Sequence, residues 1–461
     1  MITEKCEKSN MGMILVQTIM ELADELAAGT VSSRDLVEDC LQKIDDPAGE
    51  GGRVFIRVDH NGARAQADAV DNLRKNGAAL SKLAGIPVSI KDLFDIQGQT
   101  TAAGSKVLKG NQVAAADCPA VGRLRAAGLV LIGRTNMTEF AYSGLGLNPH
   151  YDTPRNPFDR STGRAPGGSS SGAAVSVADG MAAAGLGTDT GGSCRIPAAM
   201  CGITGYKPTQ ARVPLDGAVP LSSTLDSIGP LAQTVDCCAA IDEVLADRRH
   251  AAVPRDASRL RLGVIKDFVL DGMDDKVAAD FERACQALSA AGVSVVDVPL
   301  PVLLELNTVN AGGGFASAEA YAWHRPYLET RADEYDPRVA VRIMNGKNQS
   351  AADYVDVIQA RRRIIEAVNV ASLGLDALIC PTIPIIAPTL AELADDSVFA
   401  DRNHLVLRNP AVSNFLDRCA IALPMHDSGS APTSLMLTGE HMGDSILFDV
   451  ARTVEKVLRR T

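Results

Sequence analysis

The chain has 461 residues, of which 46% are hydrophobic and 22% charged, so it can bury a large core and has the composition of a globular protein. Its 45 basic residues against 56 acidic ones give a formal net charge of −11, which argues against nucleic acid as a partner, because phosphate binding needs concentrated positive charge. No apolar run reaches the ~18 residues that a membrane span needs. We expect a cytoplasmic protein with no membrane partner.

The first third of the chain predicts helices alternating with short strands. Apolar residues at helical spacing favour a helix over 14–28 that Gly29 ends, and Ser32 with Asp35 form a capping-box pattern that opens a second helix through Ile44. The pattern continues with expected strands at 54–58, 86–90 and 129–133 and helices at 63–75 and 119–127.

The rest of the chain repeats this alternation more loosely. An Ala-rich segment of helical length runs from 173 to 184. Later come expected strands at 261–265, 293–298 and 377–380 and helices at 277–288 and 445–460. Such alternation is typical of an α/β protein whose helices cover a sheet. With only a modest boundary between Arg248 and Ser258, we expect one domain.

Two clusters of small residues, 167–172 and 187–193, carry the chemical signal. Glycines let the backbone approach a ligand closely, and serines place hydroxyls at the same point, so the pair of loops suggests nucleophilic chemistry. The first cluster contains a G-x-S-x-G pattern, which would make Ser170 the nucleophile of an α/β-hydrolase. That interpretation needs a preceding hydrophobic strand, which residues 160–166 do not supply.

A lysine can replace histidine as the base of a serine enzyme if its amine is neutral. Lys91 follows the apolar strand 86–90, where burial could lower its pKa by the roughly three units, or ~4 kcal/mol, that the role requires. The alternative is a solvated charge or a salt bridge to Asp92 or Asp95.

From Gly85 through Thr209 the chain closely resembles the amidase signature family, with a lysine after a strand, then GGSSSG, then GTDTGGSCRIPAAMCGITGYKPT. The segments 133–140, 153–157 and 220–230 are also similar to the family, whereas 418–424 only partly matches its late motif. The resemblance implies one large mixed β-sheet between layers of helices. It divides the domain, 1–461, into N-terminal helices (14–75), a signature core (about 80–240) and a C-terminal substrate-pocket part (about 258–461).

The resemblance also implies a Ser–cis-Ser–Lys triad that works without metal or cofactor. Carried over by position, Ser193 is the nucleophile, Ser169 the bridging serine after a cis Gly168–Ser169 bond, and Lys91 the base. The remaining implied roles are oxyanion-hole N–H groups and supporting side chains. The first set is Thr190, Gly191, Gly192 and Ser193 itself, and the second is Ser170, Asp189 and Arg195. Cys194 occupies a variable position and is interpreted as filler.

These features predict an amidase that hydrolyses a small linear carboxylic amide to acid plus ammonia or amine through an acyl-serine. The alternative is the catalytic subunit of a tRNA-dependent amidotransferase that generates ammonia from glutamine. Ile196 counts against it, because such family members usually carry glutamine there. A scaffold that has lost activity is disfavoured because all the triad positions are filled. The expected partner is the amide substrate, and homodimerisation is left open.

Overall fold

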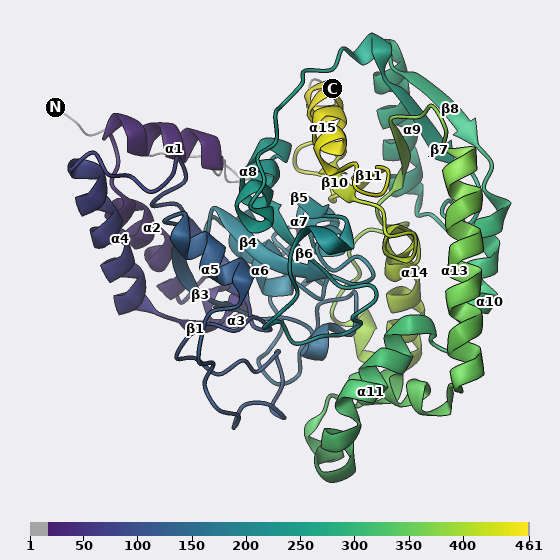
Figure 1. Cartoon of the computed structure of the whole chain (residues 1–461), viewed down its shortest axis with the longest axis horizontal. Coiled ribbons are helices and arrows are strands. Elements are labelled where there is room, and N and C mark those ends of the chain that lie inside the picture. The colour runs from purple at the N-terminus through teal and green to yellow at the C-terminus, as the bar shows by residue number, and fades with distance from the viewer. Residues whose placement is uncertain (1–16, 460–461) are drawn as a thin grey trace.

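The computed structural model describes residues 17–459 (Figure 1). Its strands form one 11-stranded mixed sheet in the order β1-β3-β2-β4-β6-β5-β10-β11-β9-β7-β8. The pairs β2–β3, β2–β4, β7–β8 and β7–β9 are parallel and the other pairs are antiparallel. The strands are β1 (Phe55–Val58), β2 (Pro87–Lys91), β3 (Val130–Thr135), β4 (Ala184–Asp189), β5 (Thr204–Lys207), β6 (Ser227–Ala232), β7 (Arg261–Ile265), β8 (Ser294–Val298), β9 (Ala377–Pro381), β10 (Ala420–Pro424) and β11 (Ser434–Thr438).

Helices pack on the sheet throughout the chain. They are α1 (Ile19–Ala28), α2 (Ser33–Asp45), α3 (Gly51–Val54), α4 (His60–Lys75), α5 (Pro119–Ala126), α6 (Ser171–Ala178), α7 (Arg195–Cys201), α8 (Val235–Ala246), α9 (Asp275–Ala290), α10 (Leu306–Val309), α11 (Gly314–Arg331), α12 (Pro337–Met344), α13 (Ala351–Ala371), α14 (Asp396–Phe415) and α15 (Asp444–Leu458). Figure 1 shows α1, α2 and α4 at one end of the molecule and α10 and α13 at the other, with α11 at the lower edge.

The core lies on both faces of the sheet. On β3, Leu131 packs in one hydrophobic cluster, while Val130 and Ile132 pack in another. Because successive side chains of a strand point to opposite faces, these two clusters lie on opposite sides of the sheet. The predicted α/β fold with a large mixed sheet between helices is therefore confirmed.

Local signals explain several element ends. Ser32 and Asp35 form the predicted capping box of α2, and Gly29 ends α1 with a φ of 70°. The predicted first helix began at residue 14, but residues 14–16 lie outside the described part, as does residue 460 of the predicted last helix.

The prediction of a helix over 173–184 was wrong in its second half. Helix α6 ends at Ala178, Gly180 has a φ of 69°, and the chain re-enters the sheet as β4 at Ala184. A left-handed glycine ends a helix readily, and pairing of β4 with two neighbouring strands outweighs the helix propensity of its alanine. Strand β4 then delivers the second serine loop directly from the sheet.

Candidate active site

Lys91 is the last residue of β2, in the sheet interior, and its side chain is fully buried. Its Nζ donates hydrogen bonds to the Ser169 hydroxyl at 2.7 Å and to the Thr188 hydroxyl at 2.8 Å. Burial lowers the pKa of Lys91 from 10.5 to about 8, because the interior disfavours the ammonium form. The salt bridge to Asp92 that the alternative required is absent from the described residues, since Asp92 pairs with Arg134 at 2.6 Å.

The first serine loop places Ser169 against this amine. The Gly168–Ser169 peptide bond is cis, as the resemblance implied. Gly168 is required by close packing, because a Cβ there would lie 2.6 Å from the backbone nitrogen of Gly146. Ser170 follows as the N-cap of α6, and its hydroxyl donates to the Thr188 carbonyl at 3.4 Å.

The second serine loop joins β4 to α7 and carries Ser193. This serine lines a cavity, and its carbonyl accepts from the Ser170 backbone N–H at 3.3 Å. Within residues 17–459, no hydrogen bond joins the Ser169 and Ser193 hydroxyls. The described structure therefore contains a Lys91–Ser169 hydrogen bond but no Ser169–Ser193 hydrogen bond.

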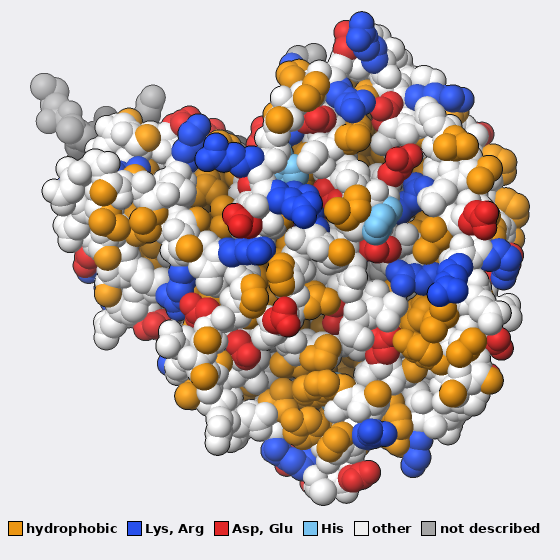
Figure 2. All heavy atoms as spheres, in the orientation of Figure 1, with side chains coloured by type: hydrophobic (Ala, Val, Ile, Leu, Met, Phe, Trp, Pro, Cys, Tyr) orange, Lys and Arg blue, Asp and Glu red, His pale blue; other side chains and the backbone are white. Residues whose placement is uncertain are grey.

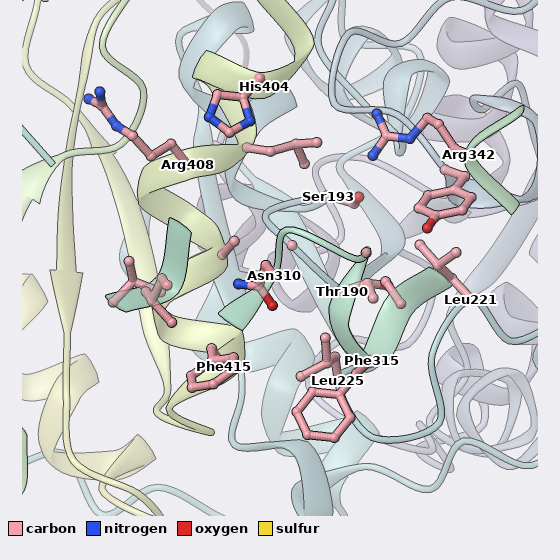
Figure 3. Close-up of a pocket in the computed structure, with 18 of the residues that line it drawn as sticks. Thr190, Ser193, Leu221, Leu225, Asn310, Phe315, Arg342, His404, Arg408 and Phe415 are labelled. Carbon is pink, nitrogen blue, oxygen red and sulfur yellow. The ribbon is translucent and has the colours of Figure 1, made fainter. Parts of the chain in front are cut away.

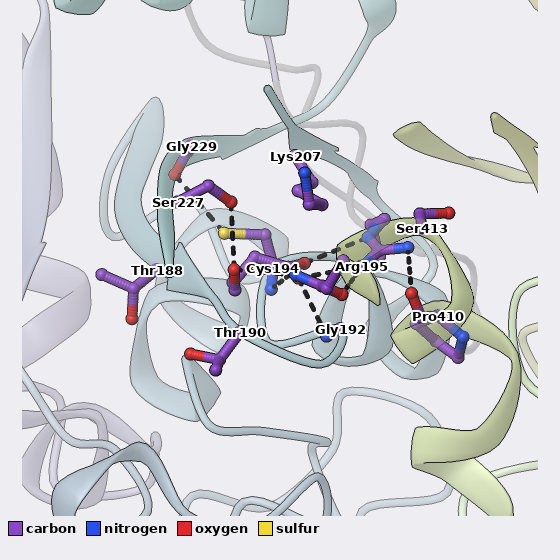
Figure 4. Close-up of polar contacts among 12 residues, drawn as sticks. Thr188, Thr190, Gly192, Cys194, Arg195, Lys207, Ser227, Gly229, Pro410 and Ser413 are labelled. Atoms are coloured by element: carbon purple, nitrogen blue, oxygen red, sulfur yellow. Dashed lines mark hydrogen bonds and ion pairs between the residues drawn. The ribbon is translucent and has the colours of Figure 1, made fainter. Parts of the chain in front are cut away.

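A buried ion pair holds the second loop in shape (Figure 4). The Asp189 carboxylate accepts from Arg195 at 2.8 Å and from the backbone N–H groups of Gly192 and Cys194. Burial alone would raise the pKa of Asp189, but Arg195 and the Asn414 amide keep it well below its usual range. Arg195 also donates to the Pro410 carbonyl, so it ties the loop to α14.

The contacts of Asp189 leave some backbone N–H groups of the second serine loop without an acceptor. The Gly192 N–H is engaged by Asp189 and is not available to an oxyanion in this conformation. In the described structure, the N–H groups of Thr190, Gly191 and Ser193 donate to no protein acceptor. The Thr190 hydroxyl donates to Asp226 at 2.5 Å, and burial raises the pKa of Asp226 to about 6.

Ser193 opens onto a cavity of about 440 Å³. Figure 3 shows Ser193 and Thr190 in its wall, with Leu221, Leu225, Phe315 and Phe415 supplying apolar surface. A volume of this size holds a substrate of drug-like dimensions rather than the smallest amides alone. No Asp or Glu belongs to the described lining, although the whole chain has a net charge of −11.

Basic side chains line the same cavity: Arg342 of α12 and His404 and Arg408 of α14. The Arg342 guanidinium lies 4.7 Å from the ring centroid of Tyr142. It makes no hydrogen bond or ion pair with any described residue, and burial lowers its pKa. Arg408 differs, because it donates to Asn409 and to the Val269 carbonyl.

Other residues considered from the sequence do not reach this cavity. Ser170 is fully buried and outside the lining, which gives no support to a nucleophile elbow. Burial raises the pKa of the Cys194 thiol, whose sulfur donates to the Gly229 carbonyl (Figure 4). Trp323, also outside the described lining, packs beside Tyr327 and His324 at the edge of the core.

Sequence reasoning missed four residues of this site: Thr188, Asp226, Asn414 and Arg342. Thr188 and Asp226 stand inside quoted motifs and could have been found as polar residues beside the serine loops. Asn414 and Arg342 come from helices far along the chain, where no spacing pattern marks them.

The outer surface shows no single dominant charge on the face in Figure 2, where Lys and Arg side chains are interspersed with Asp and Glu and hydrophobic side chains gather in the lower part. No helix within residues 17–459 is long and apolar enough to cross a bilayer.

A mixed sheet holds a buried lysine against one serine loop, and a second serine loop beside it lines a cavity, an arrangement that fits a C–N hydrolase of the amidase type. The Amidase family model matches residues 35–448, so the chain belongs to this family.

Individual relatives cover most of the chain. It is 36% identical over 404 residues to a 2-amino-5-chloromuconic acid deaminase from Comamonas testosteroni, with 86% of each protein covered. It is 32% identical over 460 residues to a glutamyl-tRNA(Gln) amidotransferase subunit from Koribacter versatilis, covering 92% of this chain and 94% of that one. A crystal structure of an amidase matches with a TM-score of 0.86 at 30% identity, covering 95% of this chain and 99% of the other.

Proposed function

We propose that the protein is a serine amidase that hydrolyses a small linear amide, releasing ammonia or an amine through an acyl-Ser193 intermediate. The observation that carries this proposal is the hydrogen bond from the buried Lys91 amine to Ser169, beside the loop that presents Ser193 to the cavity. Lys91, with a pKa lowered to about 8, is neutral often enough near physiological pH to act as a base.

The proposed reaction transfers one proton along the three residues and back. The neutral Lys91 amine takes the proton of the Ser169 hydroxyl, Ser169 takes the proton of Ser193, and the Ser193 oxygen attacks the amide carbonyl. The free N–H groups of Thr190, Gly191 and Ser193 stabilise the resulting oxyanion. The proton then returns through Ser169 to the leaving nitrogen, the C–N bond breaks, and water hydrolyses the ester with the same groups as base and acid.

The second transfer requires the Ser193 hydroxyl to turn toward Ser169. We propose that the Ser193 side chain makes this turn by rotation about χ1 between staggered positions. Catalytic hydrogen bonds are often unformed in unliganded enzymes and tighten when substrate binds. We therefore assign closure of the Ser169–Ser193 bond to the substrate complex.

Arg342 supports a narrower substrate class, namely amides that also carry a carboxylate. Its guanidinium lines the cavity, has no described acidic partner, and is partly withdrawn from water. An unpaired buried cation is costly unless a ligand neutralises it, and guanidinium binds carboxylate through two parallel hydrogen bonds. The name of the Comamonas relative also contains an acid.

The first experiment measures ammonia release from a panel of amides with and without a carboxylate, using the wild type, Ser193→Ala and Ser169→Ala. Ser171→Ala is the matched control, because it changes a serine of the same loop that the mechanism does not use. We expect both triad variants to lose turnover and the control to keep it. Normal hydrolysis by Ser193→Ala would overturn the proposal.

A second experiment tests the substrate class. Arg342→Met should lower kcat/KM about 100-fold for an amide that carries a carboxylate, since two hydrogen bonds to a charged group are lost, and leave an uncharged analogue of similar size unchanged. Equal losses for both amides would show that Arg342 does not recognise a carboxylate.

A second candidate function is that of an amidotransferase component, which the 32% identity to the Koribacter protein favours. Such a protein would need partner subunits and would release ammonia from glutamine. Gel filtration combined with a glutaminase assay separates the two proposals: turnover of simple amides by the isolated chain supports the amidase, and glutamine hydrolysis only in the presence of partner subunits supports the alternative.

A further inference from the structure

The amine of Lys91 contacts two hydroxyls, although the proposed proton relay uses only one. Besides Ser169, Nζ donates to Thr188 Oγ1 at 2.8 Å, and among the described residues it has no third hydrogen-bond partner. We propose that Thr188 is a positioning residue that orients the Lys91 amine so that its lone pair faces Ser169. This inference rests on the proposed function, because it assigns a role within the same relay.

The reason lies in the geometry of a neutral amine, which has one lone pair and two N–H bonds. Rotation about the final C–N bond of lysine would turn the lone pair in any of three directions. A fixed acceptor for one N–H removes part of this freedom. Thr188 provides it from β4, which is hydrogen-bonded to β2, the strand that carries Lys91.

Thr188 is itself held in place through its hydroxyl and its carbonyl. It is 4% exposed, its hydroxyl bonds Lys91, and its carbonyl accepts from the Ser170 hydroxyl at 3.4 Å. Preorganised groups of this kind add to a reaction rate because they need no rearrangement when the proton moves.

The same contact affects the acidity of the ammonium form. An oxygen that accepts from Nζ stabilises the protonated lysine more than the neutral one, so its removal lowers the pKa of Lys91 further. The titratable groups around Lys91 are Cys194, Asp189 and Asp226, with Asp92 and its partner Arg134 next along the strands. A substitution of Thr188 by valine keeps all of these.

The experiment uses the full-length chain and a fluorophosphonate probe, because this reagent needs an activated serine but no identified substrate. Ser193 would attack phosphorus, the P–F bond would break with release of fluoride, and the serine proton would pass through Ser169 to Lys91. The labelling rate is measured from pH 6.5 to 9.5, and the modified peptide is identified by mass spectrometry.

Thr188→Val is the test variant and Thr188→Ser the conservative one. We expect Thr188→Val to lower the plateau rate about tenfold, as for the loss of one hydrogen bond to a charged or reacting group, and to move the acid limb of the profile to lower pH. Thr188→Ser should restore both the plateau labelling rate and the position of the acid limb. If Thr188 had a merely structural role, Thr188→Val would change the labelling rate without moving the acid limb of its pH profile.

Thr135→Val is the matched control. Thr135 lies on β3 in register with Lys91, is fully buried, and its hydroxyl has no hydrogen-bond partner within the described structure. We expect Thr135→Val to have the labelling rate and the pH profile of the wild type. Thermal unfolding shows whether each variant is folded, and Thr188→Ala replaces Thr188→Val if the latter does not fold.

The inference is overturned if Thr188→Val has the pH profile of the wild type, or if Thr135→Val shows the same shift. The proposed function fails in a different way, namely if the probe labels a residue other than Ser193 or if Lys91→Met reacts as fast as the wild type.

Discussion

The pH dependence of activity tests the role of Lys91 most directly. Burial lowers its pKa from 10.5 to about 8. At pH 7 this gives about 9% neutral amine, against about 0.03% for an unshifted lysine, which is a gain of roughly 300-fold or about 3 kcal/mol in favour of the base. Because the side chain is fully buried, solvent does not screen this shift.

The direction of the pH dependence follows from the proposed mechanism, since only the neutral Lys91 amine accepts a proton. We expect kcat/KM to rise about tenfold per pH unit below pH 8 and to level off above it. The pKa of Asp226, about 6, lies below this limb, so this neighbour is mostly ionised at pH 6.5 and fully ionised at pH 8 and above. Circular dichroism at each pH confirms that the protein remains folded.

A flat profile, or one with a midpoint near 6.5 that is typical of histidine, would refute the assignment of Lys91 as base. The profile of Lys91→Met provides the control: any residual activity should have lost the limb near pH 8.

Further predictions concern the residues around the site. Arg195→Met should lower the free energy of unfolding by about 3–5 kcal/mol, measured by denaturant titration, because it leaves the Asp189 carboxylate buried without its cation; an unchanged stability would contradict the role given to this pair. Iodoacetamide should leave native activity intact and alkylate Cys194 only after unfolding, since burial raises the pKa of that thiol. Glu319→Ala should cost about 2–3 kcal/mol in the same titration, because its carboxylate accepts hydrogen bonds from Ser222, Ser223, Thr224 and Tyr354; a loss below about 0.5 kcal/mol would show that these bonds are replaced by water.

The fold could be predicted where local signals are strong. The capping box of α2 and the apolar strand that ends at Lys91 were both found from the sequence and are confirmed. Strand β4 was missed because its sequence, AGLGTD, has no β-branched run, and its conformation is imposed by pairing with β2 and β6.

Only the part of the site formed by Lys91 and the two serine loops could be predicted. Glycine and serine clusters pointed to the loops, and the structure brings Lys91 and Ser169 into contact. Asn414, by contrast, reaches Asp189 from 225 residues away in the sequence, and nothing in the local pattern of α14 marks it. Such a contact depends on tertiary packing alone.

Under the proposed function, catalysis and selectivity come from different parts of the chain. The proposed relay belongs to residues 91–193, whereas much of the cavity wall comes from α10–α12 and α14. Asp226 and Glu319 connect the two: Asp226 accepts from the Thr190 hydroxyl and from the Ser222 N–H, and Glu319 of α11 holds that serine from the other side. Since Thr190 also offers a free N–H beside Ser193, hydrogen bonds connect the cavity wall to a proposed oxyanion donor. We therefore expect substitutions in this wall to change kcat as well as KM, because the wall proposed to recognise the substrate is hydrogen-bonded to the loop that carries Ser193.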